Sequence, residues 1–115
     1  MSKKDIFCPV EVTLKVIAGR WKVVIIHHLL DGTKRFNQLQ RLMHGITHRT
    51  LTKQLREMED SGLLIRKDFG EIPPRVEYSI SPLGASLEPV LRAMHEWGEM
   101  HEEECRDIPD KSVKA

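Results

Sequence analysis

The side chains best suited to chemistry in this 115-residue sequence form a basic, hydrogen-bonding stretch near its middle. Arg49 and Lys53 are four residues apart, so they would share one face of a helix. A guanidinium can bond a guanine base through two N–H groups, whereas an ammonium contacts phosphate as a point charge. The stretch therefore predicts contact with double-stranded DNA. Its candidate contact residues are His48, Arg49, Thr50, Thr52 and Lys53.

Three more cations flank this stretch. Lys34 and Arg35 stand just before a short apolar pattern and are expected to contact phosphate, which positions a protein on DNA without reading its sequence. Arg75 follows Pro73 and Pro74, which stiffen the connector between two predicted strands. We expect Arg75 near the adjacent minor groove or the DNA backbone. Each cation alone is more often a solvated charge, but their grouping favours DNA.

Charge is also separated along the chain. Residues 20–75 hold 11 Lys and Arg against 6 Asp and Glu, whereas residues 76–115 hold 4 against 9, although the whole chain has a net charge of +1. A basic middle suits a polyanion, and an acidic end is freer to meet protein. The simpler alternative is that the charge separation has no binding role and reflects only solvated helix faces that differ in charge.

Cys8 is the candidate redox sensor. It stands directly before Pro9 at a predicted helix start, where the positive end of the helix dipole makes a thiol more reactive. An inert thiol packed in a subunit interface is an equal alternative. Cys105 is a possible disulfide partner for Cys8 of a second copy, if the first and last helices share an interface. Two cysteines in all fit a reducing cytoplasm better than a disulfide scaffold.

Metal binding and catalysis have weaker support. His101 and Cys105 are four residues apart, as are His44 and His48, but no triad of ligands at structural spacing appears. A metal-responsive regulator is therefore only an alternative. No histidine has an evident nucleophile partner, so we predict no enzyme and no cofactor. The longest apolar run has four residues, at 23–26, which predicts no membrane span.

Periodicity predicts the elements that would position these residues. Helices are expected at 9–18, 21–31, 36–43 and 47–61, strands at 63–69 and 76–80, and a long last helix from Ser81-Pro82, bent at Pro89. Residues 1–7 and the tail from about residue 102 are expected to be mobile or frayed, with 106–115 flexible. The order predicts one domain with a core at about 8–101, mainly α with a small β-hairpin wing. The third and fourth helices form a helix-turn-helix, whose second helix lies in the DNA major groove.

The last helix carries a stripe that would be a large exposed apolar patch on a monomer. We therefore predict a homodimer, although the stripe could instead fold back onto the chain's own core. The residues expected in the dimer interface are Leu87, Val90, Leu91, Met94 and Trp97.

Many short motifs in order carry a resemblance to one family. They include Cys8-Pro9-Val10-Glu11, Gly19-Arg20-Trp21-Lys22, Arg49-Thr50-Leu51-Thr52 and Pro73-Pro74-Arg75-Val76. The chain resembles the HxlR-type bacterial winged helix-turn-helix regulators, relatives of the MarR group, over about residues 8–101. The resemblance implies a cytoplasmic homodimer that binds inverted repeats at promoters and dimerises through its first and last helices. It also implies that a cysteine at the place of Cys8 commonly senses oxidants or electrophiles.

Together these observations predict a sequence-specific transcriptional regulator, acting as a repressor by occluding a promoter. A winged-helix module that binds protein without binding DNA is the alternative, because a fold alone does not settle function.

Overall fold

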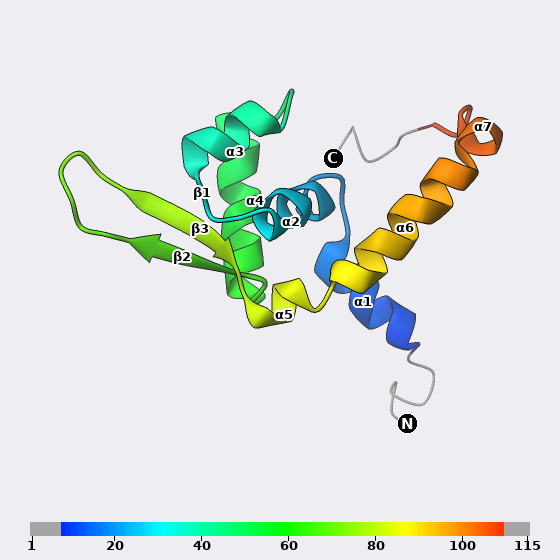
Figure 1. Ribbon diagram of the computed structural model, residues 1–115, viewed down its shortest axis with the longest axis horizontal. Coiled ribbons are helices and arrows are strands. Elements are labelled where there is room, and N and C mark those ends of the chain that lie inside the picture. The colour runs from blue at the N-terminus through cyan, green and yellow to red at the C-terminus, as the bar shows by residue number, and fades with distance from the viewer. Residues whose placement is uncertain (1–7, 110–115) are drawn as a thin grey trace.

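The computed structural model describes residues 8–109 (Figure 1). In chain order the elements are α1 (Pro9–Ile17), α2 (Lys22–Leu30), β1 (Lys34–Arg35), α3 (Phe36–Leu42), α4 (His48–Asp60), β2 (Leu64–Asp68), β3 (Val76–Ile80), α5 (Pro82–Ala85), α6 (Glu88–Met100) and α7 (Glu102–Cys105). No helix within this range is long and apolar enough to cross a membrane. The ends expected to be mobile, 1–7 and 110–115, lie outside the described residues.

The first four predicted helices are confirmed within about two residues at each end. Pro9 occupies the first position of α1, where a missing N–H costs nothing. Gly45 and Gly62 follow α3 and α4 with φ of 87° and 80°. These left-handed conformations are open to glycine and strained for other residues, which is why both helices end there.

The buried core lies where α2, α3, α4 and the sheet meet. Its side chains are almost entirely aliphatic, and they come from elements far apart in the sequence. The fully buried members are Ile25, Ile26, Leu29, Leu39, Met43, Leu51, Leu55, Met58 and Leu63. β3 adds Tyr78 from the sheet. α4 is thus held on one face by the core, while its other face is left to solvent.

The sheet has three antiparallel strands rather than the two that the sequence predicted. β1 pairs with β3 through Lys34 opposite Tyr78 and Arg35 opposite Glu77, giving the strand order β1-β3-β2. A strand of two residues carries no alternating pattern, so periodicity could not reveal it. β2 and β3 continue beyond this pairing as a hairpin that projects from the body in Figure 1, the predicted wing.

The single long last helix was a wrong prediction, because the segment forms α5, α6 and α7. Ser81 caps α5 by accepting a hydrogen bond from the Gly84 N–H at 3.0 Å. Gly84 packs so closely that an added Cβ would lie 2.2 Å from the Leu63 carbonyl oxygen. Pro89 does not bend a helix but stands in the first turn of α6, where prolines are well tolerated. Residues 102–105, expected to be frayed, are helical as α7.

α1 and α6 lie to one side of the helices and sheet that form the core, and α6 extends away from them (Figure 1). α6 has no fully buried residue, although its Leu91 and the preceding Leu87 pack against the core. Three other residues of the predicted stripe, Val90, Met94 and Trp97, are exposed, with Trp97 at 59%. α1 likewise exposes Val10, Val12 and Leu14. These apolar side chains of α1 and α6 are left uncovered by the chain itself.

Candidate nucleic-acid interface

The orientation of α4 is set by its buried face and its N-terminal cap. Leu51, Leu55 and Met58 are three or four residues apart and fully buried. The Thr47 side-chain oxygen accepts a hydrogen bond from the Thr50 N–H at 3.1 Å, and the Thr47 hydroxyl is 3.0 Å from that of Thr50. This cap satisfies a backbone donor that the first turn would otherwise leave unpaired. The same cap engages the half-buried Thr50 hydroxyl in a contact within the protein.

The opposite face of α4 is basic and open. The side chains of His48, Arg49, Lys53 and Arg56 are all exposed. Within residues 8–109 no ion pair occupies Arg49 or Arg56, so both guanidiniums are available to a ligand. Thr52 is half-buried, and its hydroxyl donates to the His48 carbonyl oxygen at 2.8 Å.

Glu57 joins α4 to α2. Its carboxylate lies 3.0 Å from the Lys22 ammonium and 4.0 Å from that of Lys53. The Lys22 side chain is only 14% exposed, so this pair is less screened by water than a surface pair. Lys53, by contrast, is largely exposed and can leave Glu57 at little cost.

The start of α4 also contacts α3. The His48 and Phe36 rings lie with their centroids 4.6 Å apart. Both residues are the first of their helices, so this contact joins the two helices of the helix-turn-helix at their N-terminal ends.

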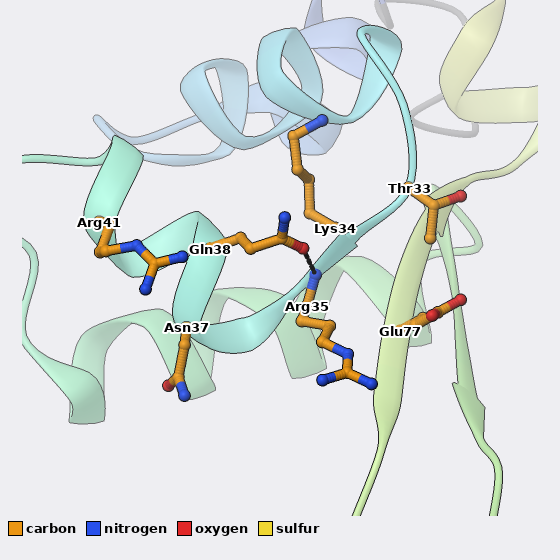
Figure 2. A pocket seen from close by; sticks show the side chains of 7 residues that line it. All are labelled: Thr33, Lys34, Arg35, Asn37, Gln38, Arg41 and Glu77. Atoms are coloured by element: carbon orange, nitrogen blue, oxygen red, sulfur yellow. Dashed lines mark hydrogen bonds between the residues drawn. The ribbon is translucent and has the colours of Figure 1, made fainter.

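A polar cleft of about 560 Å³ lies where β1, α3 and β3 meet (Figure 2). Arg35 comes from β1, Arg41 and Asn37 from α3, and Glu77 from β3. The Gln38 side-chain oxygen accepts a hydrogen bond from the Arg35 N–H at 2.8 Å, which fixes the turn into α3. Asn37 and Arg41 were not among the predicted contacts, although their spacing of four residues, which places them on one side of a helix, was a usable signal.

Lys34 is directed away from the other cations of this cleft, toward α2 (Figure 2). Its ammonium donates to the Gly32 carbonyl oxygen at 3.2 Å and lies 3.9 Å from the Asp31 carboxylate. The side chain is only 13% exposed. Lys34 therefore closes the loop between α2 and β1 in this structure.

Arg75 is held inside the wing by neighbouring residues. Its guanidinium donates to Glu77 at 3.2 Å and to Glu71 at 3.5 Å. It also lies 3.8 Å from the centre of the Phe69 ring. The exposed cations of the wing are instead Arg66 and Lys67 on β2.

The two thiols lie in different elements and both are free. Cys8 is exposed just before α1, and Cys105 is half-buried in α7. In the described range, no three His, Cys, Asp or Glu side chains are grouped so that they could hold a metal ion.

A second hollow, of about 980 Å³, separates α2 from α6. Its lining mixes apolar side chains such as Val24 and Met94 with His27, His28 and His95. Burial lowers the pKa of His28, and the adjacent His27 lowers it further. Arg92, which pairs with Glu88, also lines it, so the hollow is not purely apolar.

A helix-turn-helix with an open basic second helix, followed by a projecting hairpin, defines the winged helix-turn-helix transcriptional regulators. The model of the HxlR-like helix-turn-helix family matches residues 16–106, and the chain belongs to this family. The HTH-type transcriptional regulator YybR of Bacillus subtilis is 48% identical over 102 residues, covering 84% of this chain and 82% of the relative.

Two solved structures show the same architecture. The redox regulator HypR in its reduced form superimposes with a TM-score of 0.82 at 45% identity, covering 86% of this chain and 98% of HypR. The reduced form of the transcriptional regulator YodB from B. subtilis gives 0.74 at 31% identity, covering 84% and 96%. The predicted family and fold class are confirmed.

Replacing Glu57 with alanine leaves the poorly exposed Lys22 ammonium without its carboxylate. We expect the free energy of unfolding to fall by about 1–2 kcal/mol, measured by urea denaturation. Glu59→Ala is the control, because it removes an exposed carboxylate from the same helix and should change stability by less than about 0.5 kcal/mol. Equal stability of the two variants would contradict a stabilising role for this ion pair.

Proposed function

We propose that this chain is a sequence-specific DNA-binding repressor that acts as a homodimer on inverted repeats, with α4 in the major groove. The observation that carries the proposal is the open basic face of α4, directly opposite the buried Leu51, Leu55 and Met58. Arg49 lies in the first turn, where side chains of a recognition helix reach base edges. Its free guanidinium suits a guanine, and Lys53 suits a phosphate.

Arg35 and Arg41 contact the DNA backbone beside the major groove. Both line the cleft between β1 and α3, where Glu77 is the one carboxylate in the lining. Cations in such a position fix the register of α4 on the duplex without reading bases. Lys34 and Arg75 support this surface indirectly. The Lys34 side chain binds the loop before β1, and the Arg75 side chain binds residues of the wing. His48 and Thr52 are further candidate contacts on α4, and Thr50 orients the first turn.

The homodimer forms through α1 and α6. Val90, Met94 and Trp97 are exposed on α6, and Val10, Val12 and Leu14 are exposed on α1. A two-fold partner would remove this surface from water, which is favourable by roughly 25 cal/mol per Å² of apolar area. Two copies of α4 would then read half-sites separated by about one helical turn, 10–11 base pairs, or a multiple of it.

Cys8 makes the repressor responsive to oxidants or electrophiles. It is an exposed thiol directly before α1, so its modification would disturb the helix that we place in the dimer interface. The structural similarity to HypR, a redox regulator, supports this assignment. Diamide would join two thiols as a disulfide and itself accept the two hydrogen atoms. Cys105 of the second subunit is the candidate for the other thiol.

Arg49→Ala should weaken binding to a selected duplex by about 1–3 kcal/mol and relax the base preference at one position of each half-site. Lys53→Ala should weaken binding to all sequences alike, and the slope of log K against log salt should become about one unit shallower per subunit. Filter binding or fluorescence anisotropy over a range of salt measures both effects.

The matched control for these variants is Arg106→Ala, which removes an exposed arginine just after α7 and should leave affinity and slope unchanged. A wild-type affinity that does not depend on salt would contradict DNA binding. It would favour a module that binds protein instead.

Trp97→Glu puts a carboxylate in the middle of the exposed stripe of α6. We expect the wild-type chain to sediment as a dimer at micromolar concentration and the variant as a monomer, because a buried unpaired charge opposes association. Ile65→Glu, at a similarly exposed apolar residue of β2, should still sediment as a dimer. A wild-type monomer in sedimentation velocity would overturn the proposed assembly.

Cys8→Ser should bind the selected duplex as the wild type does but stay bound when diamide or a quinone is added. The wild type should dissociate under the same treatment, as measured by anisotropy. Cys105→Ser shows whether the second thiol is needed. If it is, diamide should no longer release this variant from DNA, whereas a quinone should still release it. If Cys8→Ser releases DNA normally, thiol sensing through Cys8 is excluded.

A further inference from the structure

The connector at the end of the wing exposes an apolar side chain. Ile72 is 97% exposed, more than any other large apolar side chain in residues 8–109. It stands in the connector between β2 and β3, and Pro73 and Pro74 follow it. Water surrounds this side chain almost as fully as in an unfolded chain, so Ile72 contributes nothing measurable to the core.

The cations of the wing are set back from this point. Arg75, which the sequence placed at the tip, is engaged by Glu71 and Glu77 and covers the Phe69 ring. Its side chain is 34% exposed. Arg66 and Lys67 are exposed but belong to β2, behind the connector. The wing thus has an apolar, proline-stiffened tip, with both cations and carboxylates behind it on β2 and β3.

We propose that Ile72 enters the DNA minor groove as an apolar wedge, beside the major-groove segment that α4 reads. This inference rests on the proposed function and adds a specificity-determining residue to it. Apolar side chains that enter the minor groove open a base step partially, and the cost depends on the sequence of that step. Ile72 would therefore favour operators with a flexible step at this position.

Exposed cations on β2 allow the wing to approach DNA phosphates. Arg66 and Lys67 follow one another on a strand, so they point to opposite faces of the hairpin. This places a cation on each side of the wing, as contact with the two phosphate strands that border a groove requires. The hairpin also holds three carboxylates: Glu71 and Glu77 pair with Arg75, and Asp68 accepts a hydrogen bond from the Gly70 N–H. Pro73 and Pro74 have no N–H groups to leave unpaired when water is removed.

The test compares Ile72→Met, which keeps an apolar side chain, with Ile72→Gln, which has a similar length and a polar end. A duplex is first selected from a random-sequence library by the wild-type chain. The fluorescent adenine analogue 2-aminopurine then replaces single adenines across it, because its emission rises when a base unstacks. Ile65→Ala is the control for loss of an exposed apolar side chain elsewhere in the hairpin.

We expect a fluorescence rise at one step outside the α4 half-sites with the wild type, Ile72→Met and Ile65→Ala. Ile72→Gln should lose this rise and bind about tenfold more weakly, with an unchanged salt slope, because an apolar contact releases no counterions. All four chains should unfold at the same urea concentration. Binding and fluorescence of Ile72→Gln equal to the wild type would overturn this inference alone.

A second result would also overturn it. If Ile72→Gln bound DNA normally but associated less in sedimentation, the tip would be a protein contact. Failure of the wild-type chain to retain any duplex from the library would instead overturn the proposed function itself.

Discussion

The burial of one face of α4 determines what the rest of the structure can do. Leu51, Leu55 and Met58 are in the core, and each residue of an α-helix is turned by about 100° from the one before it. Rotating α4 by a single residue would bring polar side chains into the core and turn Arg49 partly toward the protein. The apolar contact that stabilises the fold is therefore also the contact that directs Arg49 and Lys53 outward.

Apolar burial alone does not fix where α4 lies along its axis, because the hydrophobic effect has no preferred direction. Two directional contacts supply this restraint. The His48 ring packs on Phe36 at the start of the helix, and Glu57 pairs with Lys22 of α2 further along. A recognition helix must hold its side chains to within a fraction of an ångström of a base edge, so both restraints serve function as well as stability.

Local signals made most of the fold predictable, and contacts between distant residues account for what was missed. Thr47 and Gly62 bound α4 through caps that the sequence itself displays. For the last helical segment the sequence indicated only a bend at Pro89, because the packing of α5 on the Leu63 carbonyl through Gly84 joins residues far apart in the chain. β1 likewise exists only because β3 lies beside it. At the site, the α4 face followed from spacing, whereas the inward direction of Lys34 depends on where α2 ends.

The two exposed apolar features of this chain differ in a way that separates their roles. α1 and α6 expose several large apolar side chains, as a subunit interface requires, and the usual size of such an interface is about 800 Å² per partner. Ile72 offers one side chain at the end of a two-stranded arm, far too little area for a stable protein contact. The minor groove is only about 6 Å wide, so one side chain is enough to fill it. The larger apolar area exposed on α6 therefore supports assembly of two subunits, and the small apolar area of Ile72 supports contact with a groove. Both roles depend on apolar side chains.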